Sequence, residues 1–242
     1  MLGALTGVFI NTGAIIIGSL LGLAFKKGIP EKYAKAITVA IGLYVMFIGI
    51  SGALKTEIVD GTVTGADPLI LILSMISGIV VGTLLKIQDR LDNLGKKLES
   101  KFSKESQGNF SKAFVNSTLL FCIGAMAITG SVESALENNH STLIAKSVLD
   151  GINSIIFAAN MGIGVLFSAA AVFLYQGIIA VAAYFLGASF LSPVMNLHLI
   201  ATGSLVILAL GLNLIGITKI KVADLLPAIF IAPVLSLLLT LF

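Results

Sequence analysis

Long apolar segments constrain what this chain can fold into more than any other feature of its sequence. A helix needs about 20 predominantly apolar residues to cross the roughly 30 Å of hydrocarbon in a bilayer. Eight segments of this kind follow one another along the 242 residues, and the fifth and sixth come from one continuous apolar tract. They cover approximately residues 3–25, 36–54, 68–87, 113–131, 143–166, 169–191, 198–217 and 222–242. The sequence therefore predicts about eight transmembrane segments.

These segments are expected to be helices. Backbone polar groups in lipid must be satisfied within the protein, which leaves helices and closed barrels as spanning structures, and the alternating pattern of barrel strands is absent. The chain is 57% hydrophobic and 11% charged, whereas soluble domains carry about 25% charged residues. We expect an all-α, polytopic membrane protein that forms a single transmembrane domain over residues 1–242 and is surrounded by the lipid bilayer.

Prolines mark some of the helix ends. Asp67 and Pro68 are typical of an N-cap followed by a proline in the first helical turn, at the start of the third segment. Pro227 and Pro233 fall inside the eighth segment, so that helix is expected to kink or break.

The basic residues outside the predicted spans lie almost entirely on one side. With eight spans, thirteen of the 15 lysines and arginines fall at span ends or in loops of one side, Lys55 lies in a loop of the other side, and Lys146 lies inside the fifth span. The positive-inside rule then places both termini and the loops at 55–67 and 132–142 outside the cytoplasm. This placement also accounts for the net charge of +3 without a nucleic-acid partner.

The one long hydrophilic stretch, at about 88–112, has the pattern of an amphipathic helix. Leu91, Leu94, Leu98 and Phe102 recur at three- and four-residue steps among charged residues, which gives one apolar face. We expect this cytoplasmic segment to lie along the membrane surface; docking to a partner is the alternative.

Glycines spaced four residues apart favour close helix packing in lipid. Three such pairs lie within the predicted spans, and they are Gly3/Gly7, Gly18/Gly22 and Gly78/Gly82. The pattern fits packing within one chain or between copies, and its abundance favours a homo-oligomer, with a dimer as the first expectation.

Spans one to three and six to eight are also candidates for inverted three-helix repeats, since 42–55 and 201–219 share a glycine-spaced texture that ends in lysine.

Lys146 and Asp150 are the only formally charged residues between Thr142 and Leu191. Their i, i+4 spacing places them on one helical face. Counting about 1.5 Å per residue from an outer edge near Thr142, Lys146 lies roughly 6 Å and Asp150 roughly 12 Å deep. A charge at the helix centre costs about 2.5–3.5 kcal/mol on insertion scales. The pair therefore either ties the fifth span to its neighbours or forms a polar site on a solute path.

Four other polar residues within the spans are candidate members of a site with this pair, and they are Asn11, Glu133, Asn116 and Asn160. Asn11 lies at a depth similar to that of Asp150, and Glu133 lies at the outer end of the fourth span. Together with the charged pair they predict a polar pocket in the outer half of the membrane. Asn116 begins the fourth span on the cytoplasmic side, and Asn160 lies deeper in the fifth.

Signatures of enzymes and metal sites are absent from the sequence. It has no H-E-x-x-H, no G-x-S-x-G and no glycine-rich phosphate loop, and Asp150 is the only aspartate deep in a span. His140 and His198 stand far from any second histidine or cysteine at ligand spacing. We expect no enzymatic activity, no metal and no cofactor.

Several segments resemble the bacterial integral membrane family known as domain of unknown function 554. The more specific are "STLLFCIGAMAITGSVE" (117–133) and "LIAKSVLDGINSIIFAANMGIGV" (143–165), and the others are "FINTGAIIIGSLLG" (9–22), "ATG" (201–203) and "LPA" (226–228). The resemblance implies a multi-pass protein of the prokaryotic cytoplasmic (inner) membrane. It implies no substrate or mechanism.

Two functions fit these observations. The first is a transporter or channel for a small solute or ion; Lys146 favours an anion, whereas Asp150 with Glu133 favours a cation or proton. The second is a non-transporting scaffold or regulatory protein that acts through a partner. A hydrated path past Asp150 favours the first, and tight packing around it favours the second.

Overall fold

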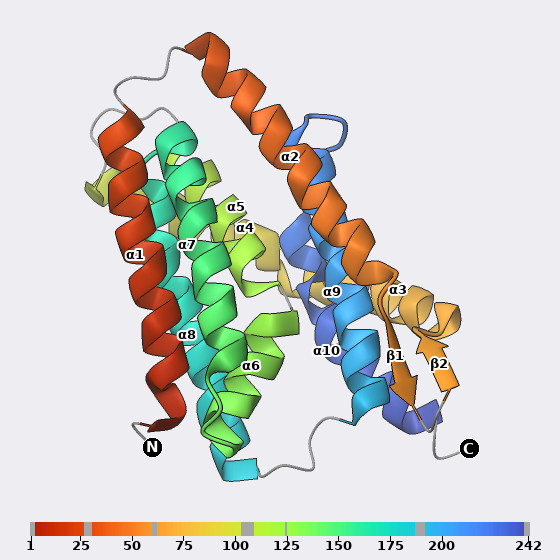
Figure 1. Cartoon of the computed structure of the whole chain (residues 1–242). Coiled ribbons are helices and arrows are strands. Elements are labelled where there is room, and N and C mark those ends of the chain that lie inside the picture. Colours follow the sequence, from red (N-terminus) through yellow and green to blue (C-terminus); the bar gives the residue numbers. More distant parts are fainter. Residues whose placement is uncertain are drawn as a thin grey trace. The chain divides into compact units, whose positions relative to one another are not determined.

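The computed structural model describes residues 3–26, 31–59, 62–102, 109–123, 125–186 and 192–239, and it is built almost entirely of helices (Figure 1). The α-helices are α1 (Thr6–Lys26), α2 (Glu31–Ala53), α3 (Pro68–Leu85), α4 (Ile87–Phe102), α5 (Asn109–Cys122), α6 (Ala125–Leu136), α7 (Ser141–Met161), α8 (Gly164–Leu186), α9 (Pro193–Leu214) and α10 (Leu226–Leu239). Short 3-10 helices precede α1 and α10, namely η1 (Gly3–Leu5) and η3 (Val222–Leu225). An antiparallel hairpin of β1 (Thr56–Val59) and β2 (Thr62–Gly65) lies in the loop before α3.

Six helices are long and apolar enough to cross a membrane, which confirms the first, second, third, fifth, sixth and seventh predicted spans. They are Gly3–Phe25, Lys35–Ala53, Pro68–Leu85, Ser141–Met161, Gly164–Phe185 and Val194–Leu214. The fifth and sixth separate at Gly162, whose φ of 95° is strained for any residue with a side chain. This is a few residues before the predicted boundary, because the apolar pattern alone does not mark the turn.

The fourth and eighth predicted spans differ from a single straight helix. The fourth is a pair, Phe110–Cys122 and Met126–Leu136, bent by 56°, so the chain has up to seven long spans if the pair counts as one. The eighth is the shorter apolar helix Val222–Leu238, which begins as η3 and continues as α10. Pro227 stands in the first turn of α10 and Pro233 inside it. The helix changes from 3-10 to α at Leu226 but continues through both prolines, so the kink or break expected at them stays a prediction.

Some predicted features extend beyond the described residues. These are residues 103–108 of the amphipathic segment, residues 187–191 at the end of the sixth span and residues 240–242 at the end of the eighth. The helix predicted within 88–112 is confirmed as α4, although residues 109–112 belong to α5.

The chain is organised in two compact units. The first unit comprises Met1–Thr38, Arg90–Cys122 and Met126–Ala188, and the second comprises Val39–Asp89, Ile123–Ala125 and Ser189–Phe242. This division does not separate the first three spans from the last three, because α1 lies with α7 and α8 whereas α3 lies with α9 and α10. The predicted inverted repeat of three-helix units stays a prediction.

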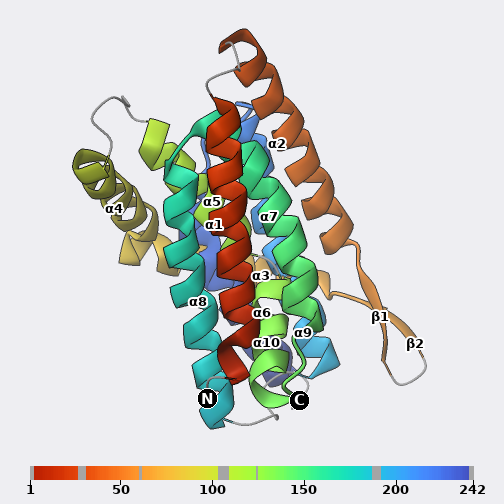
Figure 2. The same ribbon diagram turned by 60° about the vertical axis from the view of Figure 1, so that its left-hand side comes forward.

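In the first unit, α1 packs against both α7 and α8 (Figure 2). A side chain at Gly18 would clash with Gly151 O, and one at Gly22 would clash with Ile155 O. From the first contact to the second, the chain moves four residues forward on α1 and four residues forward on α7, so the two helices run parallel. The missing side chains let the two backbones approach closely, and this close approach fixes which α1 residues face α7.

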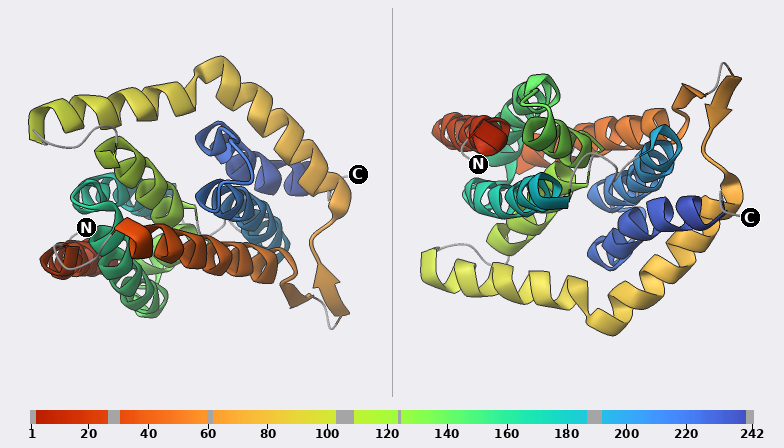
Figure 3. Two further views of the ribbon diagram at one scale, coloured as in Figure 1. Left: turned by 90° about the horizontal axis from the view of Figure 1, so that it is seen from above. Right: turned by 90° about the horizontal axis from the view of Figure 1, so that it is seen from below.

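The second unit uses its glycines in the same way. A Cβ at Gly78 of α3 would overlap Ala228 of α10, and one at Gly82 would overlap the backbone of Asp224 in η3; Figure 3 shows α3 alongside α10. Gly7 likewise packs on Leu143 in the first unit, with its Cβ position 2.7 Å from the leucine Cδ1. These glycine pairs pack within the chain, so they no longer support the predicted dimer.

Candidate functional site

Lys146 and Asp150, both on α7, form a buried ion pair. Lys146 Nζ donates to Asp150 Oδ2 at 2.7 Å. Each residue is only 5% exposed. Because a lysine and an aspartate four residues apart lie on one helical face, α7 positions both groups by itself. The pair is neutral in sum.

Neighbouring helices add two amides to this ion pair. Asn11 of α1 donates through Nδ2 to Asp150 Oδ2 at 3.1 Å and to Gln176 Oε1 of α8 at 3.2 Å. Both amide residues are fully buried. The close packing of α1 on α7 brings Asn11 within reach of the carboxylate. We refer to Asn11, Lys146, Asp150 and Gln176 as the Asp150 cluster.

The charge of Asp150 determines how both amides are oriented. An ionised carboxylate only accepts hydrogen bonds, so Asn11 must turn its NH₂ group toward it. The second hydrogen of that group then requires the oxygen of Gln176. In this arrangement Asn11 Oδ1 and Gln176 Nε2 have no hydrogen-bond partner among the described residues. A buried polar atom left unpaired costs about 1–3 kcal/mol.

Helix α5 reaches the cluster from another side. Cys122 is buried and lies within electrostatic range of Lys146 and Asp150, and Tyr175 of α8 lies within range of Cys122. Four helices of the first unit therefore contribute residues to the surroundings of Asp150, and the ionisable ones are a lysine, a thiol and a phenol.

The other predicted site residues lie outside this cluster. Glu133 accepts through Oε2 from Thr142 Oγ1 at 2.6 Å, at the corner where α7 begins. Asn160 donates to Thr38 Oγ1 at 2.6 Å and stands ten residues beyond Asp150, which is about 15 Å along the helix. Asn116 is half-buried on α5 and makes none of the contacts of the cluster. The predicted outer pocket of four residues thus reduces to three of them, with Gln176 in place of Glu133.

Gln176 was not predicted, although the sequence carries a signal for it. It is the only glutamine or asparagine in the predicted span 169–191, and an amide in such a span usually hydrogen-bonds to another helix.

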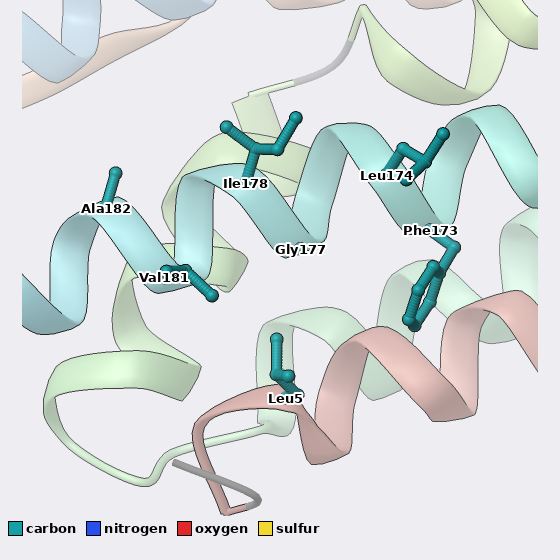
Figure 4. A pocket seen from close by; sticks show the side chains of 7 residues that line it. All are labelled: Leu5, Phe173, Leu174, Gly177, Ile178, Val181 and Ala182. Carbon is teal, nitrogen blue, oxygen red and sulfur yellow. The ribbon is translucent and has the colours of Figure 1, made fainter.

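Two pockets on the described surface are lined by none of the four cluster residues. One, of about 450 Å³, lies between η1 and α8 (Figure 4) and is lined by Leu5, Phe173, Leu174, Gly177, Ile178, Val181 and Ala182. Its apolar lining suits contact with lipid chains. The other, of about 630 Å³ in the second unit, lies where Asp67 N donates to His198 Nε2 at 3.0 Å.

No group of three or more His, Cys, Asp or Glu side chains is placed to hold a metal ion in the described part of the chain.

The long apolar helices and the intramembrane polar cluster define a multispanning helical membrane protein. The chain belongs to the protein family of unknown function DUF554, which matches residues 6–237.

Two bacterial relatives align along nearly their full length. The chain is 34% identical over 228 residues to "Uncharacterized membrane protein YdfK" of Bacillus subtilis, covering 94% of each chain. It is 29% identical over 234 residues to "Uncharacterized protein YqgA" of Escherichia coli, covering 95% of each. No solved structure shows a significant match to the chain.

Proposed function

We propose that the protein is a transporter or channel for a small solute or ion in the prokaryotic cytoplasmic membrane, without enzymatic activity, and that the Asp150 cluster is its polar site. The observation that carries this proposal is the buried ion pair with two amides that each retain an unpaired polar atom. Apolar residues of similar volume would pack the same helices at lower desolvation cost. Ionisable groups inside the membrane mark solute paths and proton relays.

The cluster restricts how a solute can bind. Because Lys146 and Asp150 neutralise each other, a cation has to compete with Lys146 for the carboxylate, and an anion has to compete with Asp150 for the ammonium. The burial of all four side chains corresponds to a closed site. Transport then requires α1, α7 or α8 to move so that the site opens.

The same burial favours a second candidate, a membrane scaffold or regulator that acts through a partner. Asn11 and Gln176 are fully buried, and α1 is held tightly against α7. In this function the cluster joins three helices and never opens. Of the two candidate functions, only the transporter needs the charges of Lys146 and Asp150 for solute flux.

Flux into proteoliposomes, screened over ions and small metabolites, tests the proposal. The variant Lys146→Met/Asp150→Leu removes both charges together, so neither is left buried without its partner. We expect it to fold and to lose flux. The matched control is Lys221→Met/Asp89→Leu, which removes an exposed ion pair of 3.1 Å in the second unit. We expect the control to retain the flux of the parent.

The outcomes separate the two functions. Full flux in the folded Lys146→Met/Asp150→Leu protein would remove the cluster from the transport site. A parent protein that moves none of the screened solutes, together with a double variant that is equally stable, would favour the scaffold.

A further inference from the structure

Side-chain atoms that are buried without a hydrogen-bond partner among the described residues occur in both units, and six of the nine lie in the first unit. Six side-chain atoms on α1, α5, α7 and α8 are buried without a hydrogen-bond partner among the described residues. They are Asn11 Oδ1, Ser19 Oγ, Thr118 Oγ1, Ser154 Oγ, Asn160 Oδ1 and Gln176 Nε2. We call these six residues the polar track.

The polar track extends from Asp150 in one direction along the helices. Ser154 lies one turn beyond Asp150 on the same face of α7, about 6 Å along the axis, and Asn160 lies about 15 Å beyond Asp150. Ser19 lies eight residues beyond Asn11 on α1, about 12 Å in the same direction, because α1 and α7 are parallel. All these positions are displaced toward the Met161 end of α7.

Thr118 is displaced the same way. The start of α5 contacts the start of α8, since the Phe110 and Phe167 rings lie 5.2 Å apart, so α5 runs with α8 and against α7 (Figure 2). Cys122 is near Asp150, and Thr118 precedes it by four residues. It therefore lies about 6 Å toward the Met161 end.

Packing alone does not require these unpaired atoms. Other buried serines of the same helices donate to a backbone carbonyl within one turn: Ser147 to Leu143 O, Ser117 to Ala113 O and Ser168 to Val165 O, each at 2.6 Å. A buried serine in a helix can thus satisfy its own hydroxyl. Ser19 and Ser154, although fully buried, do not. Their hydroxyls keep the capacity to bind water, which occupies polar interior sites with two to four partners.

We propose that the polar track is a path by which water and protons reach Asp150 from the Met161 end of α7, the end that the lysine distribution predicts to be cytoplasmic. This inference rests on the proposed function and names the proton as the ion that the cluster handles. A proton path needs no preformed cavity. The track only has to admit water molecules, which are small enough to enter when the helices separate slightly.

The protonation step is simple. A hydronium ion delivered by the track gives a proton to the Asp150 carboxylate; one O–H bond breaks, one forms, and water remains. Lys146 then loses its anionic partner, and Asn11 is no longer held by a charged acceptor. The titratable groups that face Asp150 during this step are Lys146 on its own helix, Cys122 from α5 and, beyond the thiol, Tyr175 from α8.

Proton entry into proteoliposomes tests the path. The vesicles contain a trapped pH-sensitive dye, and a valinomycin-mediated potassium diffusion potential drives protons inward. We expect the parent to acidify the lumen, Asp150→Asn to lose this activity, and Ser154→Ala to slow it several-fold. Ser147→Ala is the matched control on the same helix, because the Ser147 hydroxyl is already bonded to Leu143 O. We expect it to keep the rate of the parent.

A thermal unfolding measurement separates transport from folding. Ser154→Ala removes an unpaired buried hydroxyl, so we expect its unfolding temperature to equal or exceed that of the parent. A slower proton rate in this stable variant cannot come from loss of the fold.

The flux and proton measurements distinguish failure of the polar track from failure of the proposed transporter. Solute flux without proton entry overturns the track and leaves the transporter intact. Proton entry that Ser154→Ala and Ser147→Ala slow equally also overturns the track. If neither solutes nor protons move, both proposals fail. A stable Ser154→Ala variant with slow proton entry and normal Ser147→Ala vesicles supports the path.

Discussion

At the residue scale, the Asp150 cluster depends on one carboxylate oxygen. Asp150 Oδ2 accepts from Lys146 and from Asn11, and the Asn11 amide in turn orients Gln176. Of the three residues that the sequence predicted here, Asn11 and Asp150 lie at a similar depth in the membrane and Lys146 lies one helical turn away, which the rise per residue gives directly. The rotation of each helix about its axis is not given by depth, so the sequence does not show which side chains meet, and Glu133, at an outer helix end, contacts Thr142 at the start of α7.

The amide contacts predict non-additive stabilities. Asn11→Leu leaves Gln176 Oε1 and part of the carboxylate unsatisfied, so we expect a loss of roughly 1–3 kcal/mol in the free energy of unfolding. Gln176→Leu removes an acceptor that Asn11 alone uses. The variant Asn11→Leu/Gln176→Leu should lose less than the sum of the two single changes. Unfolding of the detergent-solubilised proteins in a double-mutant cycle measures this coupling. Strict additivity would show that the two amides do not interact.

At the element scale, the close approach of α1 to α7 is the contact that assembles the cluster. Glycine spacing in the sequence indicated that close packing occurs, but spacing does not name the partner helix. Gly18 and Gly22 pack on the backbone of α7, whereas a side chain at Gly13 would meet nothing within 4 Å. The glycines of one helix therefore differ in what they do, and only the three-dimensional structure distinguishes them.

This difference gives a matched pair of substitutions on α1. In Gly22→Ala the added Cβ meets the Ile155 carbonyl, which belongs to the backbone and cannot rotate away. We expect a loss of about 1–3 kcal/mol, the usual cost of overpacking. Gly13→Ala adds the same methyl group in open space, and we expect no loss or a gain of up to about 1 kcal/mol from helix propensity. Thermal unfolding of both variants checks this, and equal effects would contradict the close α1–α7 contact.

At the scale of the whole molecule, composition predicted which segments are apolar enough for lipid, and six of the eight agree with long helices. It did not predict the bend between α5 and α6 or the short eighth helix, because hydropathy averages over a segment and is insensitive to backbone direction. The division into two units was also not predicted. It depends on contacts between helices that are distant in sequence.

The homo-oligomer predicted from the sequence is a property of the whole molecule, and the glycine pairs do not support it. The glycine pairs that suggested it pack on α7, η3 and α10 of the same chain. We keep a dimer as the expected state, and mass measurement of the detergent-solubilised protein over a range of concentrations tests it. A single monomer mass at every concentration would remove the dimer.

The parallel arrangement of α1 and α7 determines how often the chain crosses between them. Two parallel spans need an odd number of crossings in the intervening chain. Helices α2 and α3 are counted as two crossings, since both are long and apolar enough to span. The bent α5–α6 pair has to supply the third, so we infer that it is a broken span rather than a re-entrant loop. This count places Lys101, before α5, and Glu137, after α6, on opposite sides of the membrane.

Cysteine labelling tests this topology. In a Cys122→Ser background, a membrane-impermeant thiol reagent added to intact cells should label Glu137→Cys and leave Lys101→Cys unlabelled, because the lysine distribution places residue 101 in the cytoplasm. Both side chains are exposed, so neither result depends on opening the fold. Permeabilised cells, in which both positions should react, are the control. Labelling of both positions in intact cells would make α5–α6 re-entrant and would contradict the crossing count. Labelling of Lys101→Cys alone would keep the count and invert the orientation, which would place the inner end of the polar track outside the cell.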